Sequence, residues 1–199
     1  MINLKRETAK LIAASSGHIT HLVASSSFEF WQRKDFRLYV AFDNVPRVEQ
    51  DRMFNELQVS LLGLFILKFE HASDNVLEEK TIVFRSFAKD LAPAYLQMCA
   101  EMGIGEEYLP TWSKLIDMRL TEYRRDFRYA EKDSKTMKEF KKESESMRIT
   151  WARIETLTID CLTHIRRGNV EKNDPLWKLL RKWFISLDVQ LNSIIEAPI

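Results

Sequence analysis

The sequence predicts an all-α fold, a single-domain bundle of about six to eight helices. Apolar residues recur at steps of three and four along most of the chain, which is the spacing of one helical face. Only five glycines and five prolines interrupt 199 residues, so long helices meet few breaks. A chain of this length, with 45% hydrophobic residues, can bury a core without disulfides or metals. We therefore expect one domain over residues 1–199. An alternative division sets residues 1–43 apart as a subregion that packs on a bundle of residues 44–199.

The first forty residues predict a helix followed by an ambiguous segment. Helical spacing of apolar residues runs over residues 4–23, and Ser25–Ser27 are expected to interrupt it. Every second residue from Phe36 to Phe42 is apolar, as in a strand, yet residues 28–42 also fit helical spacing. Because a lone strand would need a partner that the chain does not offer, we expect helix over residues 28–42.

Local signals then mark two further helices. Asp43–Pro46 is typical of a turn and a helix start, which predicts a helix over residues 45–70. Ser73–Asp74 can cap the next helix, in which Pro93 is expected to cause a kink or a split. Gly103 is followed by an apolar residue, which predicts a Schellman-type helix end.

The long segment from Thr111 to Arg167 contains neither glycine nor proline. A single helix of this length would run about 85 Å at 1.5 Å per residue, which is too long for a compact domain of this size. The helical spacing slips between residues 133 and 140, where Asp133 and Ser134 are suitable caps. We therefore expect two antiparallel helices, which form a polar hairpin around residues 119–150.

The last helix is expected after Gly168, with Asp174 as its cap and Pro175 at its first position. Its segment WKLLRKW, residues 177–183, places basic residues between two tryptophans. Such helices can contact nucleic acid, an anionic membrane or an acidic partner helix. A net charge of +1 argues against a dominant nucleic-acid surface, and core packing is the first interpretation of the tryptophans.

Cysteine usage and hydropathy indicate the compartment. Cys99 and Cys161 lie in apolar, helix-like segments without CxxC spacing, which is typical of core residues in a reducing compartment. The longest apolar stretch, LQVSLLGLFILKF, is shorter than the ~20 residues that a transmembrane helix needs. The basic and apolar N-terminal segment superficially resembles a signal peptide, but it is too polar to be one. We expect a cytoplasmic protein.

Sequence motifs of catalysis are absent. The chain has no glycine-rich phosphate loop, no HExxH, no GxSxG and no paired Glu-x-x-His units. This removes the specific reasons to propose an enzyme, and we predict no cofactor and no metal site.

One polar stripe crosses the apolar segment FNELQVSLLGLFILKFEH, residues 54–71. Glu56, Ser60 and Gly63 share one helical line there. The stripe predicts either a polar site or a close helix–helix contact with Glu56 near its edge. We favour the contact, because the small residues let a neighbouring helix approach and Arg52, one turn earlier, can pair with Glu56.

Carboxylates in apolar helical segments are the sharpest candidates for a site. A lone buried carboxylate is costly, so each must be paired, bound to a metal or in contact with a ligand. These carboxylates are Glu56, Glu70, Asp117 and Glu155, with Arg119, Arg124 and Arg153 as available partners.

Asp160 and His164 lie four residues apart on one helical face. A contact between them would orient the imidazole and raise its pKa. Alternatively, His164 and the arginines after it supply positive charge at a helix C-terminus. The candidate ligand-binding residues of the chain are Glu56, Ser60, Glu155, Asp160 and His164.

We expect a protein-interaction or regulatory binding module that forms a homodimer through its apolar faces and the hairpin 119–150. One alternative is an enzyme, or a protein that binds a small molecule or metal, with a carboxylate-lined cavity between helices. The other alternative is a nucleic-acid or membrane-surface binder that uses the basic C-terminal helix.

Overall fold

The computed structural model describes the backbone of residues 2–74, 78–140 and 142–196, and side chains within residues 15–72, 81–140 and 142–192. The described chain forms seven α-helices and two short 3-10 helices, without a strand, so the all-α prediction is confirmed. The helices are α1 (Ile2–Gln32), α2 (Lys34–Tyr39), η1 (Phe42–Asn44), α3 (Arg47–Asp74), α4 (Glu78–Glu101), α5 (Leu109–Ser134), η2 (Lys138–Phe140), α6 (Glu145–Ile165) and α7 (Pro175–Glu196).

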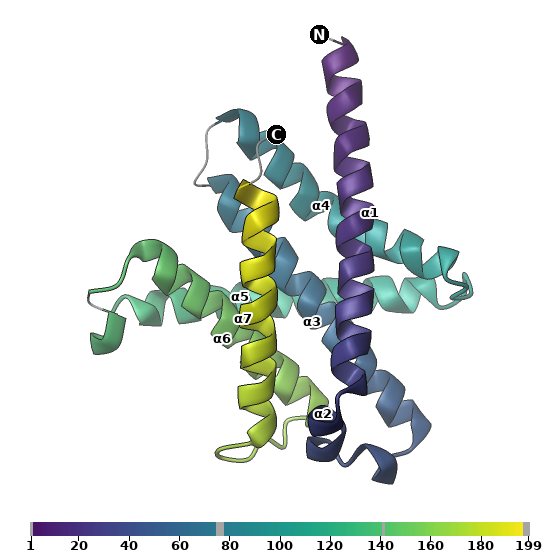
Figure 1. Cartoon of the computed structure of the whole chain (residues 1–199), viewed down its shortest axis with the longest axis vertical. Coiled ribbons are helices and arrows are strands. Elements are labelled where there is room, and N and C mark those ends of the chain that lie inside the picture. Colours follow the sequence, from purple (N-terminus) through teal and green to yellow (C-terminus); the bar gives the residue numbers. More distant parts are fainter. Residues whose placement is uncertain (1, 75–77, 141, 197–199) are drawn as a thin grey trace.

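Helix α3 is the central element, and α1, α4, α5, α6 and α7 all pack against it (Figure 1). Every α3 residue from Glu56 to Phe69 is buried, which explains why this segment has the longest apolar stretch. The cluster of buried apolar side chains includes members of all seven α-helices. Within the described residues, no helix is both long and apolar enough to cross a membrane.

The first helix is longer than predicted. Helix α1 continues through Ser25–Ser27 to Gln32, so the expected interruption is wrong. The helix tolerates these serines because the Ser25 hydroxyl donates to the Leu22 carbonyl of the preceding turn, 3.4 Å away, and Ser27 is buried by packing. Tertiary contacts here outweigh a weak local preference.

The strand alternative for residues 28–42 is wrong, and the preferred helical interpretation is confirmed. These residues form the end of α1, then α2 and the start of η1. Extended backbone at Arg33 and left-handed backbone at Ala41, with φ of 49°, separate the three helices. The breaks turn Phe30, Phe36 and Phe42 into the core, although their spacing does not follow one continuous helix.

Most helix ends follow the local signals. Gly103 has φ of 91°, and the Ile104 amide donates to the Cys99 carbonyl at 3.0 Å, as in a Schellman motif. The Asp174 side chain accepts from the Leu176 amide at 2.9 Å and so caps α7. Pro93, in contrast, does not split α4, which continues through it with Pro93 on its exposed side.

Two helices replace the long segment, as predicted. Helices α5 and α6 pack against each other, and their connection forms the tip at the left of Figure 1. The predicted cap at Asp133 or Ser134 is wrong: both end α5, and Ser144 caps α6 by accepting from the Met147 amide at 3.2 Å. Ser134 is unavailable as a cap because its buried hydroxyl donates to the Glu131 carbonyl at 2.7 Å.

Candidate functional site

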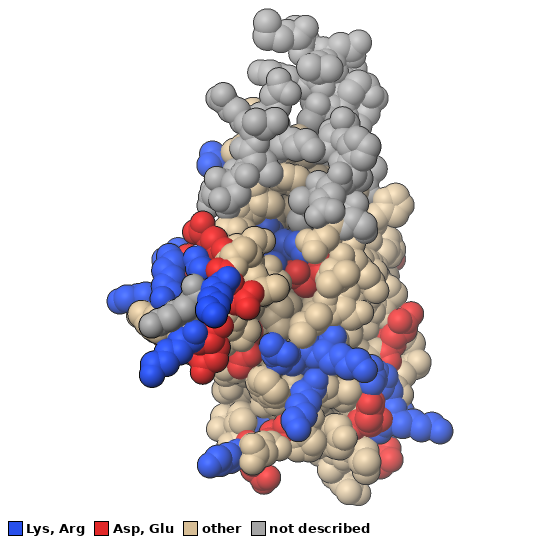
Figure 2. Space-filling view, turned by 60° about the vertical axis from the view of Figure 1, so that its left-hand side comes forward, with Lys and Arg blue, Asp and Glu red and all other residues tan. Residues whose placement is uncertain are grey.

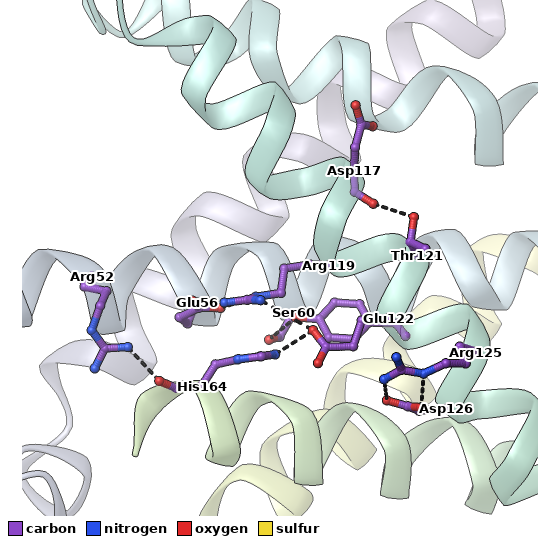
Figure 3. Close-up of polar contacts among 11 residues, drawn as sticks. Arg52, Glu56, Ser60, Asp117, Arg119, Thr121, Glu122, Arg125, Asp126 and His164 are labelled. Carbon is purple, nitrogen blue, oxygen red and sulfur yellow. Dashed lines mark hydrogen bonds and ion pairs between the residues drawn. The ribbon is translucent and has the colours of Figure 1, made fainter. Parts of the chain in front are cut away.

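Glu56, Ser60 and His164 meet where α3, α5 and α6 pack together (Figure 3), and Asp160 of α6 lies near the charged groups of α5 in the same region. We call this region the α3–α5–α6 network. Its centre is a two-point ion pair between helices α3 and α5. Arg119 donates to the two carboxylate oxygens of Glu56 at 3.0 and 2.7 Å. Glu56 is only 4% exposed, so its charge requires this partner. The predicted pair with Arg52 is therefore wrong.

Arg52 serves a different purpose in the network. Its guanidinium donates to the carbonyls of His164 and Ile165, at 2.6 and 2.9 Å, and its Nε donates to Glu49 at 2.9 Å. The last carbonyls of a helix lack partners within the helix, and they carry its negative end. Arg52 of α3 thus stabilises the C-terminus of α6.

Ser60 and Gly63 make the close helix contact that their size predicts. The Ser60 hydroxyl lies 3.0 Å from the Tyr123 hydroxyl of α5, and both groups are buried. A Cβ on Gly63 would lie only 2.6 Å from Cδ2 of the Tyr123 ring. The ring fills the space above Gly63, and burial raises the pKa of Tyr123 well above its usual value. This part of the stripe is closed packing.

His164 and Asp160 face α5 separately. The spacing allowed a contact between His164 and Asp160, as the less favoured alternative, but the Nε2 atom of His164 lies 2.8 Å from a carboxylate oxygen of Glu122 instead. Glu122 also lies 3.4 Å from Arg119, which links the histidine to the central ion pair. The network therefore runs from the end of α6 into the core without a gap.

Asp160 is the one carboxyl group of the network that the described residues leave incomplete. It is 8% exposed, and its Oδ2 atom has no hydrogen-bond partner among them. Burial raises the pKa of Asp160 from 3.8 to about 7, and the charges of Asp126 and Glu122 add to the effect. Arg125 and Arg119 act in the opposite direction but do not cancel it.

The fifth candidate, Glu155, lies apart from the other four, between α6 and α7. Its carboxylate is 3.5 Å from Nε of Arg181, and burial raises its pKa above the usual value. The sequence offered Arg153 as a partner for such carboxylates. Arg153 instead donates to Asp188 at 2.8 and 3.1 Å, and Lys68 lies 2.9 Å from the same carboxylate.

The outer side of α7 is a feature that reasoning from the sequence missed. Trp177, Arg181, Ile185 and Val189 follow one another at steps of four and form a single line on the helix surface. Ile185 is 39% exposed and Val189, one turn later, is 61% exposed. We call this line the α7 outer stripe. Trp177 is half-buried and packs against the core, as the sequence predicted, and the exposed apolar residues of the stripe are Ile185 and Val189.

Basic side chains accompany the stripe. Lys178 and Lys182 line a hollow of about 270 Å³ together with Trp177, Arg181 and Ile185. The Arg181 guanidinium lies 5.6 Å from the centre of the Trp177 ring. Figure 2 shows a band of Lys and Arg side chains across the lower middle of this side of the molecule.

No group of three or more His, Cys, Asp or Glu side chains within the described residues could hold a metal ion. The ligand-binding role of Glu56, Ser60, Glu155, Asp160 and His164 stays a prediction, and the protein itself supplies partners for most of their polar atoms. Comparison of the chain with protein-family models, with curated proteins and with solved structures gave no match.

Proposed function

We propose that this protein is an interaction module that binds an acidic amphipathic helix of a partner protein along the α7 outer stripe. The observation that carries the proposal is the pair of exposed apolar side chains, Ile185 and Val189, in line with the half-buried Trp177. They lie beside two lysines that form no ion pair with the described residues. A helix whose inner face is already buried has no structural need for a second apolar line. Exposed apolar lines rimmed by charge are typical of protein-binding surfaces.

The length of the stripe suits a helical partner. From Trp177 to Val189 the stripe spans about 18 Å at 1.5 Å per residue. Helix-binding surfaces are contacted by side chains at i, i+3 or i+4 and i+7 of the bound helix, which needs about three turns. The hollow beside Ile185 can receive one bulky apolar side chain of the partner.

The charge of the stripe determines the chemistry of the partner. Glu155, an acidic group beside the stripe, already faces Arg181. Within the described residues, Lys178 and Lys182 take part in no ion pair, so their charges are available. Carboxylates on the flanks of a docked helix would pair with them, and like-charged helices would be rejected.

The geometry favours binding over catalysis. The alternative of a carboxylate-lined cavity would place Glu56 and Ser60 in an open space. Both face protein groups instead, Arg119 and Tyr123. Three surface hollows of about 430, 410 and 270 Å³ are lined by other residues.

The test uses two synthetic helical peptides of about 15 residues, each with leucines at i, i+4, i+7 and i+11. One carries glutamates on its flanks and the other carries lysines. We expect the acidic peptide to bind with an affinity that weakens as salt rises, and the basic peptide not to bind.

Two variants locate the binding surface. Lys178→Glu with Lys182→Glu should weaken binding of the acidic peptide about tenfold, because each exposed pair contributes up to about 1 kcal/mol. The matched control reverses two exposed lysines elsewhere, Lys89→Glu with Lys114→Glu, and should leave binding unchanged. An equal loss of affinity for the acidic peptide in both double variants would contradict the proposal. Binding to phosphatidylserine vesicles without binding to the peptide would assign the stripe to membranes instead.

A further inference from the structure

A second hollow lies between α1 and α7, on a different side of α7 from the outer stripe. It measures about 430 Å³, and its lining residues from α1 are Leu22, Ser25, Ser26, Glu29, Phe30 and Arg33. Trp183, Ser186, Leu187 and Gln190 line it from α7. Both helices pack on α3, and Figure 1 shows α1 and α7 running along the same direction in front of it.

We infer that the α1–α7 hollow binds a small organic cation that carries a flat apolar ring. Its volume falls in the range of about 300–1,000 Å³ that is usual for small-molecule sites. Such sites combine an apolar or aromatic floor with a few polar groups at the rim. The hollow has both parts, and they come from two rigid helices.

The aromatic floor favours a flat ring. Phe30 and Trp183 stack with their ring centres 4.4 Å apart, which joins α1 to α7 at the base of the hollow. Phe30 is 1% exposed, and the Arg33 guanidinium already lies 5.6 Å from the centre of its ring. The aromatic surface open to a ligand is therefore the exposed 9% of Trp183. Aromatic side chains attract flat rings by stacking and attract cations through the negative face of the ring.

The charges at the rim favour a positive ligand. Arg33 is already neutralised by Asp35, to which it donates two hydrogen bonds at 2.9 and 2.6 Å. Glu29 is exposed and has no hydrogen-bond or ion-pair partner among the described residues. Of the two charged side chains that line the hollow, Arg33 is paired with Asp35, and Glu29 is the one without a partner among the described residues.

A binding role of the hollow would also account for the serines within α1. Ser25 and Ser26 face the hollow from α1, and Ser186 faces it from α7. Small hydroxyl side chains keep the space open and can accept from an ammonium group. Larger side chains at these positions would fill the space between the two helices.

The test compares two probes with the same ring and opposite charge, tryptamine and indole-3-acetate, by ligand-detected NMR titration. A ligand of about twelve non-hydrogen atoms should bind with a Kd on the order of 1 mM. We expect tryptamine to bind at least fivefold more tightly than indole-3-acetate, because Glu29 and the aromatic floor both favour the cation.

Two variants decide whether the hollow is the site. Glu29→Gln should weaken tryptamine binding about threefold and leave indole-3-acetate unaffected, whereas Glu139→Gln, on a distant exposed turn, should change neither. Ser186→Phe should reduce tryptamine binding at least tenfold by filling the hollow. If Ser186→Phe does not fold, the Glu29→Gln variant still shows whether tryptamine binds in the hollow. Equal affinity for the two probes, unchanged binding in Glu29→Gln, or no tryptamine binding at millimolar concentration would each overturn the inference.

Discussion

Asp160 makes a pH dependence of stability predictable, because its carboxyl group is buried without a full set of partners. In the folded protein its pKa is about 7, against 3.8 for an ordinary aspartate. The groups that face it are the carboxylates of Asp126 and Glu122 and the guanidinium groups of Arg125 and Arg119, all on α5. Replacing it by asparagine removes the charge and preserves the size and shape of the side chain.

The sign follows from proton binding. Between pH 4 and pH 7 the folded protein holds a proton on Asp160 that the unfolded chain has already lost. The contribution of this group to stability is therefore full below pH 4, falls as pH rises to 7 and is constant above that. The gap between the two pKa values corresponds to about 4 kcal/mol at 1.36 kcal/mol per pKa unit. Water penetration reduces this amount, and we expect about 2–4 kcal/mol.

The experiment is urea unfolding, followed by circular dichroism, of the natural protein and the Asp160→Asn variant from pH 4 to pH 8.5. We expect equal stability at the acid end and a more stable variant at the alkaline end. The difference between the two proteins is the measured quantity, because carboxylates whose pKa is lowered, such as Asp174 and Asp35, make both proteins more stable as pH rises. The matched control, Asp117→Asn on the exposed side of α5, should show no pH-dependent difference. A constant difference between Asp160→Asn and the natural protein at all pH values would refute the reasoning.

Two other changes test the packing and the capping. Gly63→Ala should destabilise the protein by about 1–2 kcal/mol, because overpacking against Tyr123 exceeds the gain in helix propensity; a higher Tm in thermal unfolding would contradict this. Ser144→Ala should cost about 1 kcal/mol through loss of the α6 cap, measured by urea unfolding, and an unchanged midpoint would show that the cap contributes nothing.

The helices and several of their ends were predictable from the sequence because their signals are local. A glycine with positive φ, such as Gly103, or a capping aspartate, such as Asp174, specifies its own backbone conformation. The serines of α1 are also a local signal, but they led to a wrong prediction of where this helix ends. Their local preference for a break is weak, and contacts with distant helices outweigh it.

The partners in the α3–α5–α6 network could not be predicted from spacing. Arg52 is four residues from Glu56, and side chains at this spacing are neighbours on a helix, which is why Arg52 was favoured. The actual partner is Arg119, 63 residues further along the chain. Which arginine reaches Glu56 depends on which helices meet and at what register. The sequence indicated that Glu56 needed a partner and offered Arg119 among several arginines, but it did not show which of them would reach Glu56.

Helix α7 has two apolar lines, and the sequence alone did not show that one of them ends at the surface. Leu176, Leu180, Phe184, Leu187 and Leu191 form the buried side of the helix. The α7 outer stripe begins one residue later, and one residue rotates a helix by about 100°. A single packing interface covers little more than that angle, so it cannot bury both lines. In a sequence the two lines merge into one broad apolar pattern, and the natural inference is a deeper core. In the structure Trp177 is half-buried against the core, and the far end of the second line, Ile185 and Val189, faces solvent. This exposed end is the part of the line that we propose a partner helix covers.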